Sequence, residues 1–86
     1  MAKMIVEHKW SQENSEEVFK VVGSIVEMSK DGQLPDGYRV KSIDLLDGQN
    51  RAICTWEAPS REALSGLIEK VNPPTSHSIS EAKQIL

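Results

Sequence analysis

The sequence predicts one small α+β domain in which two helices cover one face of a four-stranded sheet. The clearest sign is residues 51–60, where a strand-like alternation runs directly into a helix start at Pro59 and Ser60. A second sign is the order of patterns, which is strand, helix, strand, strand, helix, strand. The third is the length of 86 residues, which allows one domain with a small core. The uncovered sheet face must contact water, a ligand or a second copy of the chain.

Composition places this chain among folded proteins and argues against two kinds of partner. Hydrophobic residues make up 38% of the sequence and charged residues 27%, which is typical of a globular domain. The formal net charge is −3 and no cluster of lysine and arginine is present, so we expect no nucleic-acid binding. No apolar run approaches the length of about 20 residues that spans a bilayer, and the first eight residues carry charges without an apolar stretch, so we expect no signal peptide and no membrane partner. A single cysteine excludes an intramolecular disulfide, and we expect a cytoplasmic location.

The first half of the chain is predicted to form a strand followed by a long helix. Residues 3–10 alternate between two faces, as a strand does. Asn14 with Glu17 three residues later resembles a capping box, and Ser15 is a competing cap. The helix then runs to about Lys30, and its broad apolar arc predicts that it is well covered by the sheet and a neighbouring element. The arc consists of Val18, Phe19, Val21, Val22, Ile25, Val26 and Met28.

The second half is predicted to form a hairpin, a second helix and a last strand. Strands at residues 38–46 and 51–57 are joined by a turn at residues 47–50, where Asp47 and Gly48 give the hairpin signal. Ser60 is a good cap for the helix that follows. Its apolar residues Leu64, Leu67, Ile68 and Val71 share one face, and a pair of prolines ends it. The last strand lies within residues 75–83.

These elements pack most simply as a ferredoxin-like split βαβ fold, with an antiparallel sheet whose first and third strands lie in the centre. One register places a first set of side chains under the helices: Met4, Val6, Ala52, Cys54 and Trp56. The same register places a second set on the open face: Ile5, Glu7, Lys9, Ile53, Thr55 and Glu57. The inverse register stays open, because a shift of one residue exchanges the two faces of a strand.

Three blocks of sequence resemble small, mostly uncharacterised ferredoxin-like proteins of the dimeric α/β-barrel group. The blocks are Met4-Ile-Val-Glu-His-Lys-Trp10, Gly32-Gln-Leu-Pro-Asp-Gly-Tyr38 and Ala52-Ile-Cys-Thr-Trp-Glu-Ala-Pro-Ser-Arg-Glu-Ala-Leu64. The third is similar to a stretch of a family described as nickel-binding, and the first two are similar to a neighbouring family of unknown function. The resemblance implies a homodimer in which two sheets face each other around a cavity, and it implies metal binding. The chain has no histidine in its second helix, where those relatives would have one, so no ligand set is carried over.

Four residues could carry chemistry. His8 and His77 lie on predicted strands that are neighbours in this fold, and they could bind a divalent transition metal. Glu7, Glu57 or Glu81 could then be the third ligand. The simpler reading is a pair of histidines at a surface or an interface. Glu57 could also act with His8 as a general base in an apolar cavity, or be an ordinary charge at a strand end. Cys54 is expected to be a buried and inert thiol.

Three aromatic residues, Trp10, Tyr38 and Trp56, could border a ligand pocket or a subunit interface, or pack in the core. We therefore expect a homodimeric module that binds a small ligand or a metal, with no assigned catalysis. One alternative is a cofactor-free isomerase or monooxygenase of the dimeric α/β-barrel type, with a closed pocket that contains Glu57 and His8. The other is a structural or regulatory interaction domain that accepts another chain at an edge strand.

Overall fold

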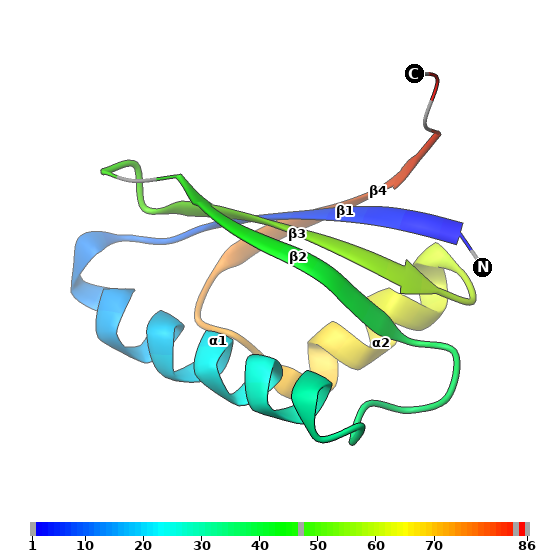
Figure 1. Cartoon of the computed structure of the whole chain (residues 1–86). Helices are drawn as coiled ribbons and strands as arrows, with labels where there is room; N and C mark the ends of the chain where they lie inside the picture. The colour runs from blue at the N-terminus through cyan, green and yellow to red at the C-terminus, as the bar shows by residue number, and fades with distance from the viewer. Residues whose placement is uncertain (1, 47, 84, 86) are drawn as a thin grey trace.

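The chain forms a four-stranded sheet with both helices on one face in a computed structural model, which describes residues 2–46, 48–83 and 85 (Figure 1). The elements are β1 (Ala2–Lys9), the 3-10 turn η1 (Gln12–Asn14), α1 (Ser15–Lys30), β2 (Arg39–Leu46), β3 (Arg51–Ala58), α2 (Arg61–Val71) and β4 (Ser76–Ala82). This order confirms the predicted ferredoxin-like α+β fold. Asp47, part of the predicted hairpin turn, lies outside the described residues.

The strands are arranged in the order β2-β3-β1-β4, and every neighbouring pair is antiparallel. The two central strands are therefore β1 and β3, as the sequence predicts. Val6 lies opposite Cys54 on one side and Ile79 on the other. The register of the edge strand β2 shifts between Val40 and Ser42, so Lys41 has no opposite residue on β3. Such an irregularity makes an edge strand a poorer template for pairing with another chain.

Burial alternates along the central strands and shows which face the helices cover. On β3 every second residue is buried: Ala52, Cys54, Trp56 and Ala58. On β1 the buried residues are Met4 and Val6, which are fully enclosed. The first of the two registers considered from the sequence is thus the observed one. Glu7 and Glu57 consequently lie on the open face, because neighbouring residues of a strand point to opposite sides.

The two helices contribute unequally to the core. Helix α2 lies against β3 and β4 and buries Leu64 and Ile68. Helix α1 buries Val18 alone, and Phe19 is 51% exposed. The prediction that the first helix is well covered is therefore wrong. A two-layer domain has no third element to cover the outer part of so broad an arc, and the inner part stands away from the sheet.

The helix ends explain where the chain turns. Ser60 has an extended backbone and its Oγ accepts a hydrogen bond from the Ala63 N–H at 3.0 Å, so the predicted cap of α2 is present. The predicted capping box at α1 is wrong, because the Asn14 side chain makes no capping hydrogen bond. Asn14 belongs instead to the turn η1, and its Nδ2 donates to Ser11 Oγ at 3.3 Å. The 3-10 turn leads directly into α1, so the backbone is already helical where α1 begins.

Replacing Ser60 tests the cap of α2. We expect Ser60→Ala to lower the free energy of unfolding by about 1 kcal/mol, because the Ala63 N–H loses its acceptor. Urea titration of both proteins measures the difference. Ser24→Ala is the matched control, since Ser24 lies on the exposed side of α1 and alanine is a good helix former there. An equal loss in both variants would contradict the assignment.

Candidate functional site

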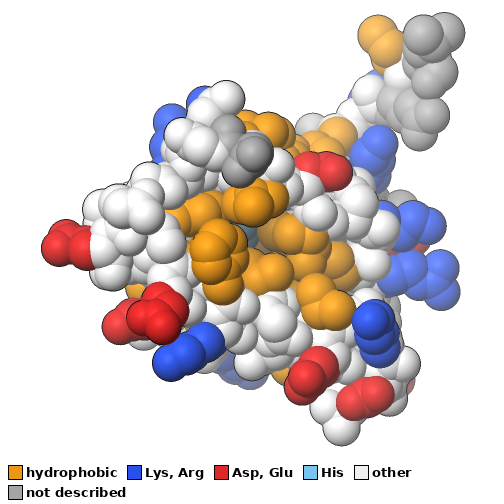
Figure 2. Space-filling model, turned by 60° about the vertical axis from the view of Figure 1, so that its left-hand side comes forward, with side chains coloured by type: hydrophobic (Ala, Val, Ile, Leu, Met, Phe, Trp, Pro, Cys, Tyr) orange, Lys and Arg blue, Asp and Glu red, His pale blue; other side chains and the backbone are white. Residues whose placement is uncertain are grey.

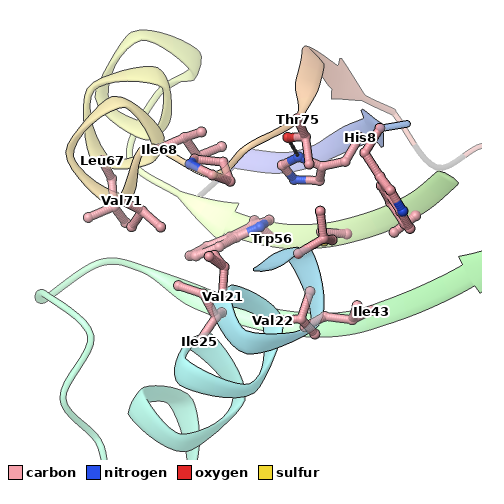
Figure 3. Close-up of a pocket in the computed structure, with 15 residues that line it drawn as sticks. His8, Val21, Val22, Ile25, Ile43, Trp56, Leu67, Ile68, Val71 and Thr75 are labelled. Carbon is pink, nitrogen blue, oxygen red and sulfur yellow. Dashed lines mark hydrogen bonds between the residues drawn. The ribbon is translucent and has the colours of Figure 1, made fainter. Parts of the chain in front are cut away.

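A hollow lies between α1, α2 and the covered face of the sheet. It has a volume of about 60 Å³, is partly open to solvent and is lined almost entirely by apolar side chains. Helix α1 supplies four of them: Val18, Val21, Val22 and Ile25. Helix α2 supplies three: Leu67, Ile68 and Val71. Figure 2 shows apolar side chains gathered on this face, with charged side chains around them, and Figure 3 shows the two helices and the sheet around the hollow.

The hollow exists because small residues lie on the sheet where α1 passes over it. Ala52 and Cys54 are neighbours in the alternating row of β3 that faces the helices, and both are among the lining residues. Neither side chain is long enough to reach a helix that stands away from the sheet. Trp56, the next residue of that row, is large and forms part of the wall. Packing defects of this kind are uncommon in small domains, because interiors are normally close-packed.

His8 brings a polar group to the hollow from the end of β1. Its Nδ1 and the Thr75 Oγ1 form a hydrogen bond of 2.9 Å, which holds the ring in one orientation (Figure 3). Burial, and secondly the nearby His77, lower the pKa of His8 below the usual value of 6.5. The imidazole is therefore neutral at physiological pH.

The two tryptophans line the hollow in different ways. The Trp10 indole N–H donates to Ser15 Oγ at 3.1 Å, and its ring packs edge-on against Phe19 with centroids 6.3 Å apart. Trp56 is only 4% exposed, and its ring forms part of the wall between the sheet and the helices. Tyr38, the third aromatic residue considered from the sequence, packs half-buried against the core instead.

The structure brings the two histidines together but separates Glu57 from both of them. His8 and His77 are opposite each other on β1 and β4, with ring centroids 5.8 Å apart. Glu57 lies on the other face of the sheet, where its Oε1 is 3.3 Å from Lys41 Nζ. In residues 2–46, 48–83 and 85 no group of three or more histidine, cysteine, aspartate or glutamate side chains could hold a metal. The expected combination of Glu57 with either histidine is wrong because Glu57 follows Trp56, which points toward the helices.

Cys54 is buried, as expected. It is 8% exposed, and burial, with a smaller contribution from the charge of Asp44, raises its pKa to about 11. The thiol is therefore protonated at neutral pH and is a poor nucleophile and metal ligand. Its place in the wall is that of a small apolar side chain.

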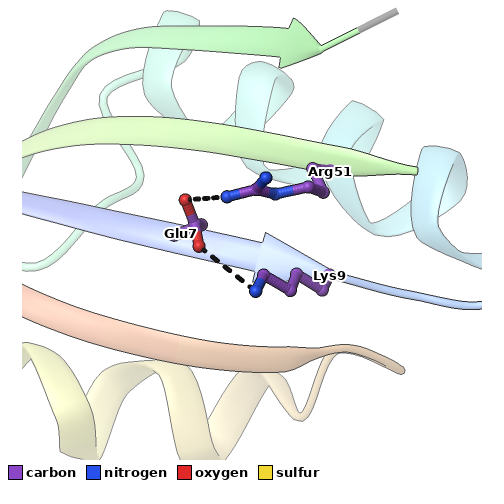
Figure 4. A network of polar contacts seen from close by, with 3 residues as sticks. All are labelled: Glu7, Lys9 and Arg51. Atoms are coloured by element: carbon purple, nitrogen blue, oxygen red, sulfur yellow. Dashed lines mark hydrogen bonds and ion pairs between the residues drawn. The ribbon is translucent and has the colours of Figure 1, made fainter. Parts of the chain in front are cut away.

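The open face of the sheet is polar around a small apolar centre. Glu7 Oε2 is 2.6 Å from Arg51 Nη2, and Glu7 Oε1 is 3.8 Å from Lys9 Nζ (Figure 4). Ile5 and Ile53 are half-buried among these charges. The Glu7–Arg51 pair was not predicted from the sequence. The available signal was that both residues lie on one face of paired strands, where opposite charges can meet.

Comparison with known proteins identifies no relative of this chain. No protein-family model, curated protein or solved structure matches the chain. Resemblance to a nickel-binding family therefore stays a prediction. Within the described residues, no helix combines the length and apolar character that crossing a membrane requires.

The pH dependence of stability tests the environment of His8. The unfolded chain takes up a proton at His8 near pH 6.5, whereas the folded protein takes it up at a lower pH. The contribution of His8 to the free energy of unfolding is therefore fully present above about pH 6.5, and it is lost as the pH falls toward the lowered pKa of His8 in the folded protein. Urea titrations at about pH 7.5 and about pH 5.5 measure this loss, which we expect to be smaller in His8→Gln. His77→Gln keeps His8 but removes the smaller cause of its lowered pKa, so its loss should lie between those of the wild type and His8→Gln. A loss in His8→Gln equal to that of the wild type would contradict the prediction.

Proposed function

We propose that this protein binds a small, mostly apolar molecule in the hollow between its two helices and its sheet. The observation that carries the proposal is the apolar lining, to which His8 and Trp56 add isolated polar atoms. Ligand pockets have this composition, with a few placed polar groups in mainly apolar walls. The sequence predicted a small-ligand module but expected the cavity on the other side of the sheet, between two subunits. The hollow is instead formed within one chain.

Filling the hollow is favourable because a ligand there removes apolar surface from water. The hollow of about 60 Å³ is only partly enclosed, so water reaches its apolar lining until a ligand of a few heavy atoms replaces it. A larger ligand needs α1 to move outward, and α1 has little to hold it, because Val18 is its one buried residue. Elements with few buried contacts are those that open most easily.

Binding is supported better than catalysis. Among the lining residues, which all belong to the described part of the chain, the titratable groups are His8 and Cys54. The Cys54 thiol is protonated at neutral pH, and no carboxylate or cationic side chain lies in the wall. An isomerase or monooxygenase would need groups that move protons or stabilise charge during the reaction. His8 alone supplies such a group.

The interaction-domain alternative is supported less well by the edge strand β4. Arg61 Nε donates to the backbone oxygen of Ile79 at 2.9 Å, so a side chain of α2 already binds one backbone acceptor of β4. On the opposite edge, β2 has an interrupted register. Both features hinder the addition of a further strand.

Benzene tests the binding proposal, since dry apolar cavities accept it. We expect benzene to shift backbone amide NMR resonances of residues around the hollow, such as Cys54 and Leu67. Val22→Phe, which places a ring in the space, should weaken binding at least tenfold. Glu27→Gln on the exposed side of α1 is the control and should bind like the wild type. Equal binding by Val22→Phe, or shifts confined to the open sheet face, would contradict the proposal.

We also propose that two copies associate through their open sheet faces. Ile5 and Ile53 form an apolar centre there, and the charges around it include both signs, such as Glu7 and Arg51. A surface of this kind can complement itself across a two-fold axis. The small core of the domain also gains from such an association. In the dimer the ligand sites lie on the outer, helical sides and do not depend on the interface.

Sedimentation equilibrium at micromolar concentration tests this association. We expect the mass of two chains for the wild type and of one chain for Ile53→Lys, because a lysine cannot lose its hydration at the apolar centre. Ser24→Lys adds the same charge on the exposed side of α1 and should leave the dimer intact. A wild-type mass of one chain, or a dimer of Ile53→Lys, would overturn the proposal.

A further inference from the structure

We propose that the ligand of the hollow is an unbranched aliphatic chain, whose uncharged end enters the hollow while its next carbons lie over Phe19 and Leu45. This inference rests on the binding function proposed above and specifies the chemical class of the ligand. Alkyl and acyl chains of medium length belong to this class.

Two exposed apolar side chains lie beside the hollow, and we call them the rim. Among the described residues three large hydrophobic side chains are exposed, and two of them, Phe19 and Leu45, are each 51% exposed. Leu45 of β2 is opposite Ala52 of β3, which lines the hollow, and opposite residues of paired strands share a face. Phe19 packs edge-on against Trp10, another lining residue, with ring centroids 6.3 Å apart. The rim is therefore an apolar surface next to an apolar space.

The surface between the hollow and the rim is apolar on both sides. Val22 of α1 and Ile43 of β2 line the hollow (Figure 3). Val22 follows Phe19 by about one helical turn, so the two side chains lie on neighbouring parts of one helix face. Ile43 and Leu45 alternate with Asp44 on β2 and share the face of the sheet that the helices cover. A ligand that extends from the hollow over the rim thus stays in contact with apolar side chains.

The size of the hollow favours a ligand that extends beyond it. A space of about 60 Å³ admits only a few heavy atoms, and the hollow is partly open to solvent. The free energy that each heavy atom can contribute is limited, so a molecule confined to this space binds weakly. A bulky ligand would have to displace α1. A narrow chain can instead leave the hollow and gain further apolar contacts at the rim without moving the helix.

The charge of the lining decides which end of the chain enters. Among the described residues that line the hollow, none is lysine, arginine, aspartate or glutamate, so a charged group inside would lack a counter-charge. His8 and Thr75 are already bonded to each other. A terminal methyl group needs no polar partner. The apolar end therefore enters, and a polar head group stays in solvent, where Figure 2 shows charged side chains around the apolar area.

The 1-alkanols from butanol to octanol test the inference, because each member of the series adds one methylene group. They are added to the full chain, and binding is followed by the amide NMR resonances of Cys54 and Leu67. We expect the affinity to rise about two- to fourfold with each added methylene, as its partial or full burial gives. An affinity that stops rising after butanol would overturn the inference. Failure of butanol and octanol alike to bind would instead refute the binding function itself.

Removing the rim gives a second measurement. We expect the double variant Phe19→Ser with Leu45→Ser to lower the ratio of octanol to butanol affinity about tenfold, because the later methylenes lose their apolar contacts. Both side chains are half-exposed, and Leu45→Ser alone, with a smaller drop, replaces the pair if the double variant does not fold. Ile85→Ser is the matched control, since Ile85 is 90% exposed and is not a lining residue. It should keep the wild-type ratio, and an unchanged ratio in the rim variants would overturn the role of the rim.

Two further outcomes separate an aliphatic chain from other occupants. Cyclooctanol has as many carbons as octanol but holds them in a ring, and we expect it to bind more weakly. Equal or tighter binding of cyclooctanol would show that α1 moves to admit a bulky ligand, and would overturn the chain. A shift of the Phe19 amide resonance that grows with protein concentration, without any alkanol, would show a second copy on the rim and would also overturn the inference.

Discussion

The antiparallel pairing of β1 with β3 is the constraint on which the rest of the structure depends. With Val6 opposite Cys54, Met4 and Val6 lie with Cys54 and Trp56 on one face, and this face becomes the core. The same pairing sends Glu7 and Glu57 to the other face. A register shifted by one residue would bury the charges and expose the core. The position of each candidate functional group follows from this one pairing.

The hollow follows from the way the helices cover that core. Helix α2 is fixed by Leu64 and Ile68, by its Ser60 cap and by the contact of Arg61 with β4. Helix α1 has one buried residue and lies over the small side chains of β3. The domain is thus close-packed on one side and open on the other. Helix α2 supplies more of the buried core contacts, and α1 has few that resist its movement. A ligand could therefore displace α1 without disrupting the part of the core beneath α2.

Much of the fold could be predicted from the sequence, but the candidate site could not. The alternation of residues 51–58 and the Ser60 cap are local signals, and they predicted the third strand and the second helix. The hydrogen bond between His8 and Thr75 joins residues 67 positions apart and leaves no local signal. The apolar arc of α1 also does not predict how far the helix lies from the sheet, because that distance depends on side chains from several elements. The separation of Glu57 from His8 did follow from one of the two registers considered, but sequence alone could not choose between them.

An apolar space separates α1 from the sheet, and the binding proposal depends on it. Diffraction from a crystal held under xenon pressure detects such a space, because xenon enters dry apolar cavities and scatters strongly. We expect a xenon atom within the hollow, next to Trp56, Val22 and Leu67. A structure in which those side chains touch one another and xenon is absent from this place would contradict it.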